Sequence, residues 1–167
     1  MSEAPDPSAA SPEPPEPVEE LPFEESVGYQ IRTAHRLLQR LLQTQIEPHG
    51  LSLGTWYFLR ALWAEDGLTQ RELSRRIGTM EPTTMSALRS LEAGGLIERV
   101  RNKTDRRKLH VFLTPKGRAL KHSLLPVARR VVGIAVTGLS GREVALLLDL
   151  LHVVSDNVRR ELKDEAA

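Results

Sequence analysis

Residues 69–114 constrain the fold more than any other stretch, because they predict two helices joined by a tight turn. Thr69 and Glu72 have the spacing of a capping box, in which each side chain accepts a backbone N–H of the other residue at a helix start. Gly78 can end that helix in a left-handed conformation. Pro82 stands where a second helix can begin without losing a hydrogen bond. The spacing therefore predicts a helix-turn-helix.

Two short strands are predicted directly after these helices. Residues 96–101 and 108–113 both alternate apolar and polar side chains, as strands with one buried face do. The polar loop between them, residues 102–107, carries three basic side chains and one acid. Residues 52–113 therefore predict a winged helix-turn-helix.

Three short runs in this part of the chain resemble the MarR family of bacterial transcription regulators. They are a leucine-glutamate helix end in residues 92–99, an aspartate-x-arginine wing in residues 105–107, and a leucine-threonine-x-x-glycine helix start in residues 113–117. The resemblance covers about residues 26–162. It implies a mostly α-helical fold with a small β-wing, and a homodimer that binds a palindromic operator in double-stranded DNA.

Long amphipathic patterns flank the winged segment, at residues 26–46 and 115–162. Pro126 lies inside the second pattern, but the apolar period continues past it, which predicts a kink rather than a helix end. These apolar faces are wider than the winged segment can cover. The resemblance implies that they are dimerisation helices, and a close-packed monomeric bundle is the alternative.

The second helix of the helix-turn-helix has the right size to fit into the major groove of DNA. If Thr84, Leu88 and Leu91 face inward, four other side chains face outward. Thr83 can then donate to a phosphate, Ser86 and Arg89 can reach base edges, and Met85 can pack on a thymine methyl group. The plainer alternative is that these are ordinary exposed helix residues. Arg89 and Ser90 also depart from the aspartate-arginine pair usual in the family, so sequence preference does not carry over.

The wing carries the other predicted DNA contacts. The resemblance matches Arg107 with an arginine that family members insert into the minor groove. Asp105 is expected to orient it through a charge-assisted hydrogen bond. Arg101, Lys103 and Arg106 are ordinary candidates for phosphate contacts.

The net charge of +1 conceals an uneven distribution along the chain. The first 25 residues contain eight acids and no lysine or arginine, so the remaining residues carry a formal charge of +9. Residues 1–22 also hold seven of the 11 prolines, which predicts a disordered acidic tail. The tail could screen the basic surface or fold on a partner, although a merely solvating role is the simpler interpretation.

Catalytic and metal-binding patterns are missing from the sequence. The five histidines form no i, i+4 pair and have no carboxylate at zinc-protease spacing, and no glycine-rich phosphate loop occurs. We therefore expect no enzyme activity, no metal and no cofactor. The chain has no cysteine and no long apolar run, which favours a cytoplasmic protein without a membrane partner.

The resemblance also implies a ligand pocket between the dimerisation helices and the winged segment, where small aromatic acids bind and lower the affinity for DNA. Trp56 is a candidate for stacking on such a ligand, although core packing explains it equally well. His35 and Arg32 could hold its carboxylate. A core or interface role is an alternative for His35.

These observations predict a transcriptional repressor that a small aromatic acid releases from DNA. One alternative is a DNA-binding regulator without a small-molecule ligand, controlled by its abundance or by a protein bound to the acidic tail. Another is a winged-helix protein-interaction module that does not bind DNA. The basic wing argues against the last of these.

Overall fold

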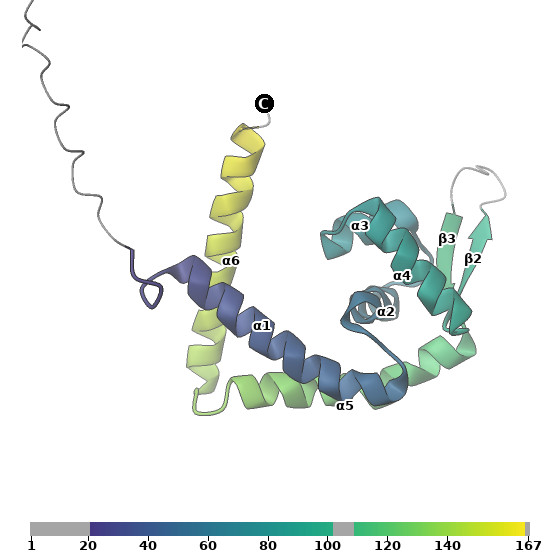
Figure 1. The fold of residues 1–167 in the computed structure, drawn as a ribbon, viewed down its shortest axis with the longest axis horizontal. Coiled ribbons are helices and arrows are strands. Elements are labelled where there is room, and N and C mark those ends of the chain that lie inside the picture. The colour runs from purple at the N-terminus through teal and green to yellow at the C-terminus, as the bar shows by residue number, and fades with distance from the viewer. Residues whose placement is uncertain (1–20, 102–108, 166–167) are drawn as a thin grey trace, which may run out of the picture. The chain divides into compact units, whose positions relative to one another are not determined.

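The computed structural model describes residues 21–101 and 109–165, and the chain divides into two compact units between Ala34 and His35. The predicted tail therefore lies outside the described residues, except for Leu21 and Pro22. The elements in chain order (Figure 1) are α1 (Val27–Ile46), a 3-10 turn (Glu47–His49), α2 (Leu53–Ala64), β1 (Leu68–Thr69), α3 (Gln70–Ile77), α4 (Glu81–Ala93), β2 (Ile97–Arg101), β3 (Leu109–Leu113), α5 (Pro115–Ala135) and α6 (Gly141–Asp164). The prediction of a mostly α-helical chain with a small sheet is confirmed.

The first unit contains the beginning of α1 and the turn before it. The rings of Phe23 and Tyr29 pack with their centroids 4.9 Å apart. The side-chain amide of Gln30 donates to the carbonyl oxygen of Glu24 at 3.0 Å. These contacts stabilise the turn, while Phe23 itself stays 68% exposed.

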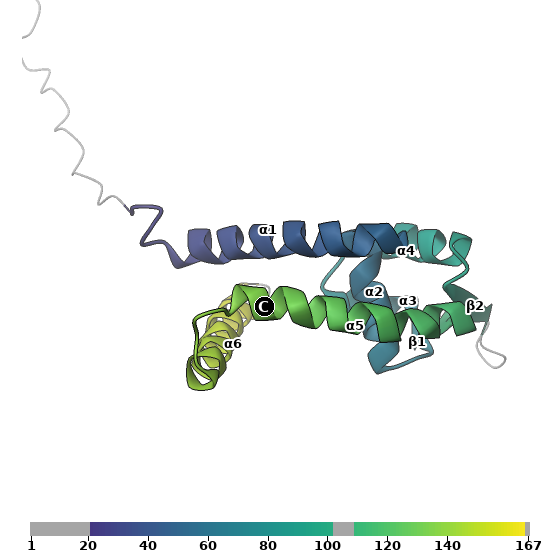
Figure 2. The ribbon, with the colours of Figure 1, turned by 90° about the horizontal axis from the view of Figure 1, so that it is seen from below.

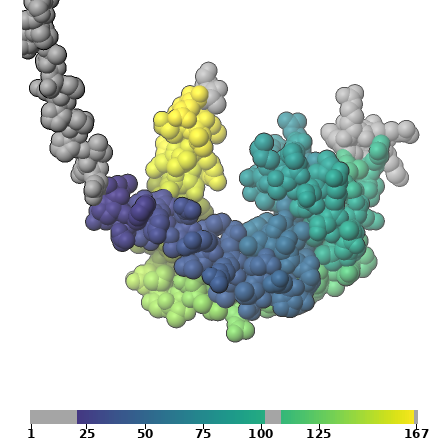
Figure 3. Space-filling view, viewed as in Figure 1, coloured from purple at the N-terminus to yellow at the C-terminus, as the bar shows by residue number. Residues whose placement is uncertain are grey.

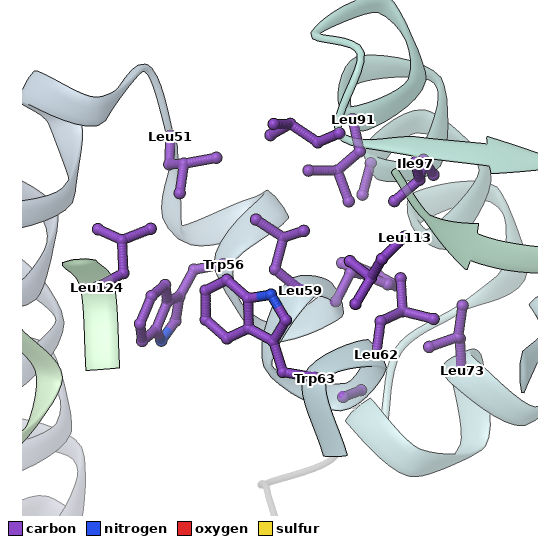
Figure 4. Close-up of a cluster of buried hydrophobic side chains, with 14 of the residues drawn as sticks. Leu51, Trp56, Leu59, Leu62, Trp63, Leu73, Leu91, Ile97, Leu113 and Leu124 are labelled. Carbon is purple, nitrogen blue, oxygen red and sulfur yellow. The ribbon is translucent and has the colours of Figure 1, made fainter. Parts of the chain in front are cut away.

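Helix α2 forms the centre of the core in the second unit. Trp56, Leu59 and Trp63 are all buried. Figure 4 shows side chains from the other elements around them: Leu73 of α3, Leu91 of α4, Ile97 of β2, Leu113 of β3 and Leu124 of α5. The core is thus mainly aliphatic, with two tryptophans at 5.7 Å in an edge-to-face arrangement.

The helix-turn-helix begins and ends as its caps predict. Thr69 Oγ1 accepts from the backbone N–H of Glu72, and Glu72 accepts from the backbone N–H of Thr69 at 2.7 Å. Gly78 ends α3 with φ of 73°. Helix α4 begins at Glu81 rather than at Pro82, because a proline is tolerated anywhere in the first turn, where the N–H groups have no partner within the helix.

The sheet has one strand more than the sequence predicted. Strands β2 and β3 form the expected antiparallel hairpin, with Ile97 opposite Leu113, and β1 pairs with the other edge of β3. Strand β1 contains only two residues. An alternating pattern cannot be recognised over so short a segment, and this explains why the sequence did not reveal it.

Helices α5 and α6 follow the wing. Helix α5 continues through Pro126 as expected, and Figure 2 shows it as one continuous ribbon. Thr114 caps α5, and Ser140 with Glu143 forms a capping box at the start of α6. No side chain of α6 is buried in the single chain, although Leu146, Leu147 and Leu151 are among its many apolar residues. This uncovered apolar surface suits the predicted role in dimerisation.

Gly117 marks a close approach between the first turn of α5 and the turn that joins α4 to β2. A Cβ atom added at Gly117 would lie 2.0 Å from the carbonyl oxygen of Leu96. The indole N–H of Trp63 donates to the carbonyl oxygen of Gly117 at 2.9 Å in the buried interior. Residue 117 is therefore a glycine because there is no space for a side chain, and not because of its backbone conformation.

We expect Gly117→Ala to destabilise the fold by about 1–3 kcal/mol or more, because the added methyl group must displace the backbone at Leu96. Denaturant unfolding measures the loss. Gly54→Ala in α2 is the matched control, because the nearest atom to its added Cβ is the Ser52 hydroxyl at an ordinary 3.6 Å. Equal stabilities of the two variants would contradict the steric explanation.

Candidate nucleic-acid interface

Helix α4 presents one face to the core and the opposite face to solvent. Thr84, Leu88 and Leu91 are buried, as predicted. On the outer side Thr83, Ser86 and Arg89 are exposed, and Met85 is half-buried. The surface over α3 and α4 is teal in the space-filling view (Figure 3). The α4 candidates for DNA contact are thus on the side of the helix that faces away from the core.

A pair of buried hydroxyl groups holds α4 against α3. The side-chain oxygens of Ser74 and Thr84 lie 2.7 Å apart, and both residues are buried. Ser74 also donates to the carbonyl oxygen of Gln70 at 3.1 Å. A buried hydrogen bond of this kind costs free energy to break, because each hydroxyl would lose its partner away from water. It therefore fixes how the outer face of α4 is presented.

The sequence did not reveal a hollow between α3 and α4. Its lining residues share no sequence motif and come from both helices: Gln70, Glu81, Pro82, Met85 and Arg89. A guanidinium N–H of Arg89 donates to the sulfur of Met85, one helical turn away, at 3.5 Å. The only sequence signal for Gln70 and Glu81 is their place as the first residues of α3 and α4.

An ion pair connects the end of α4 to the wing. Arg99 in β2 donates through Nε to a carboxylate oxygen of Glu92 at 3.0 Å, and its Nη2 donates to the same oxygen. The hydrogen bond from Arg99 lowers the pKa of Glu92, and the same contact raises the pKa of Arg99. The pair therefore stays ionised near neutral pH and fixes the angle between α4 and β2.

The predicted wing contacts lie mostly outside the described residues. This applies to Lys103, Asp105, Arg106 and Arg107, so the predicted pairing of Asp105 with Arg107 stays a prediction. Arg101 is the last residue of β2 and is exposed.

The three ligand candidates occupy different environments. Trp56 is 1% exposed, and the guanidinium of Arg60 lies 5.8 Å from the centre of its ring. His35 is exposed, and its Nε2 lies 2.8 Å from the side-chain nitrogen of Gln39, which donates to it. Arg32 is an exposed residue of α1. The protomer thus uses Trp56 in its core, while a ligand role for these residues stays a prediction.

Within residues 21–101 and 109–165, no group of three or more histidine or carboxylate side chains could hold a metal ion. None of the helices there is both long and apolar enough to cross a bilayer.

Comparison with known proteins gives three informative matches. TtmR, a helix-turn-helix transcriptional regulator of Methylorubrum extorquens (strain PA1), is 31% identical over 130 residues, which are 78% of this chain and 66% of TtmR. The crystal structure of a MarR transcriptional regulator from Methanosarcina mazei Go1 has 30% identity and a TM-score of 0.75, covering 80% of this chain and 96% of that one. BpsR of Bordetella bronchiseptica has 27% identity and a TM-score of 0.76, covering 83% and 99%.

The model of the MarR family itself matches residues 49–108, which include α2, the helix-turn-helix and β2, and end just before β3. The match therefore falls on the elements that build the outer face of α4. Members of this family are dimeric proteins that bind DNA. Together with the fold and the regulators of similar sequence, the match shows that this chain belongs to the MarR family and is a DNA-binding transcriptional regulator.

Proposed function

We propose that this protein is a repressor that recognises a specific palindromic operator, with α4 of each protomer in the major groove. The observation that carries the proposal is the outer face of α4, where Thr83, Ser86 and Arg89 are exposed on a helix whose other face is buried. A rigid helix with polar and basic side chains on one face suits the width of the major groove. The two half-sites would lie about 34 Å apart, one turn of DNA.

The side chains on this face suit different DNA contacts. The fork of N–H groups on Arg89 matches the paired acceptors of guanine, while the short hydroxyl of Ser86 can meet several base edges. Thr83 in the first turn of α4 can donate to a phosphate near the positive end of the helix. Base contacts give specificity and phosphate contacts give position, so the two kinds respond differently to substitution.

We expect Arg89→Ala to weaken operator binding by about 1–3 kcal/mol and to change binding to unrelated DNA much less. Ser86→Ala should behave in the same way. Arg101→Ala, in contrast, should weaken binding to all sequences alike and reduce the salt dependence, because it removes a phosphate contact. Gel shifts on operator and unrelated duplexes over a series of salt concentrations measure both effects. Equal losses of specific and non-specific affinity for Arg89→Ala would assign that residue to the phosphates.

The proposed wing contact pairs an acid with a cation in a basic loop. An acid weakens the attraction to phosphates unless it orients a neighbouring base-reading cation. We propose that Asp105 orients Arg107 toward the minor groove, while Lys103 and Arg106 contact phosphates.

Asp105→Ala is therefore expected to reproduce much of the affinity loss of Arg107→Ala, although it removes a negative charge. Titration of the operator with each variant measures the affinities. Asp105→Asn is a useful control, because it keeps the shape and one acceptor oxygen but loses the charge. If Asp105→Ala left operator affinity unchanged or raised it, the orienting role would be wrong.

We further propose that a small aromatic acid releases the protein from DNA. The support is the similarity to BpsR, whose DNA binding is regulated by 6-hydroxynicotinic acid. A ligand can have this effect only if it binds the DNA-incompetent arrangement of the dimer more tightly. His35 is the most testable of the three candidate residues, because its exposed imidazole can be removed without loss of core packing.

We expect 6-hydroxynicotinic acid to release the operator, and 6-hydroxynicotinamide, which lacks the carboxylate, to do so poorly. His35→Ala should raise the acid concentration needed, whereas Gln39→Ala, which removes only the hydrogen-bond partner of His35, should not. Gel shifts with increasing ligand measure release. Trp56→Ala is unsuitable here, since emptying a buried tryptophan site costs about 3–5 kcal/mol.

The ligand-free regulator is the alternative that this experiment separates. Aromatic acids would then leave operator binding unchanged for wild type and variants alike, while specific binding itself persisted. Control by abundance, or by a protein bound to the acidic tail, would remain in that case.

A further inference from the structure

The lining of the hollow between α3 and α4 is poorly suited to binding DNA phosphates. The hollow has a volume of about 480 Å³ and is lined mainly by apolar surface. Pro82 and Met85 are among its lining residues, together with one acid, Glu81, and one cation, Arg89. The charges of the acid and the cation offset each other, and an apolar lining disfavours a phosphate group. The hollow therefore suits an uncharged, apolar part of the partner.

Met85 is not needed to complete the core of the protomer. The inward side chains of α4 are Thr84, Ala87, Leu88 and Leu91, and Met85 lies half-buried outside the core cluster. Its sulfur accepts the N–H of Arg89 at 3.5 Å, so its side chain is held beside a cation on the outer face. An apolar side chain in this place is available for contact with DNA.

The major groove exposes one apolar group to a protein, the 5-methyl group of thymine. We infer that the hollow receives the methyl group of one particular thymine in each operator half-site, against Met85 and Pro82. This inference rests on the proposed position of α4 in the major groove. Contact with Met85 therefore makes this methyl group a source of specificity.

Two polar side chains at the hollow can contact further bases. Gln70, the first residue of α3, can bond the N6 and N7 atoms of the adenine that pairs with this thymine. Arg89, held by Met85, can bond a guanine in the adjacent base pair. The half-site then contains a T·A pair next to a G·C pair. Helix α3 takes part in reading the bases together with α4.

Replacing thymine by deoxyuridine tests the methyl contact, since it removes only the methyl group. An operator is first selected from a random duplex pool with the full-length dimer. Each thymine is then replaced by deoxyuridine, in one half-site and in both. Burial of one methyl group gives about a fourfold effect, and two give about fifteenfold. We expect one thymine position in each half-site to show these losses with wild type.

Variants of two methionines identify the side chain responsible. Met85→Ala should abolish the deoxyuridine effect at that position only, and Met85→Leu, which keeps an apolar side chain, should retain it. Met80→Ala is the matched control: Met80 is 75% exposed but does not line the hollow, so the deoxyuridine effect should persist.

The outcomes separate this inference from the proposed function. Specific binding without any thymine position sensitive to deoxyuridine would overturn the inference and leave the proposed function intact. An undiminished effect with Met85→Ala would equally overturn it, by assigning the methyl group to another side chain. Failure of the wild type to select any duplex would overturn both.

Discussion

The close packing at Gly117 is the constraint on which the winged part of the chain depends. The first turn of α5 approaches the carbonyl group of Leu96 so closely that no side chain fits at residue 117. Hydrogen bonds surround the contact: Thr114 Oγ1 donates to the carbonyl oxygen of Gly95 at 2.7 Å, and the amine of Lys116 donates to that of Gly94 at 2.9 Å. Trp63 adds the bond from α2 at 2.9 Å. The end of α4, the start of the wing and the start of α5 are thus held together.

Helix α4 is held at both ends. The hydroxyl groups of Ser74 and Thr84 join its first turns to α3, while the ion pair between Glu92 and Arg99 joins its last turn to β2. The ion pair is partly exposed and contributes less to stability than to geometry. With α4 held in this way, its outer side chains are preorganised, and association with DNA need not restrict the helix further. An effector would then act most easily by changing the distance between the two copies of α4.

The features that the sequence predicted are those that follow from local backbone chemistry. Thr69 and Glu72 form a capping box because their spacing alone brings the groups together, and Gly78 needs only its own positive φ. The unpredicted features depend on residues distant in the chain. Strand β1 exists because β3 provides a partner, and the hollow exists because Gln70 of α3 comes close to Met85 of α4. The complete burial of Trp56, which the sequence left open, is likewise decided by packing against other elements.

Some residues of this chain follow the MarR pattern and others depart from it, and the difference bears on which operator the protein binds. The contacts at Gly117 and the ion pair at Glu92 involve residues in the runs that resemble the MarR family, and they fix the frame. Arg89 and Ser90 depart from that resemblance, and Arg89 places a cation where an acid is usual, beside the apolar hollow at Met85. If α4 lies in the major groove as proposed, a change from acid to cation there reverses the preference for hydrogen-bond donors and acceptors on the bases. Under that proposal the operators of relatives give little guidance to the bases read here, and the side chains around the hollow would determine them instead.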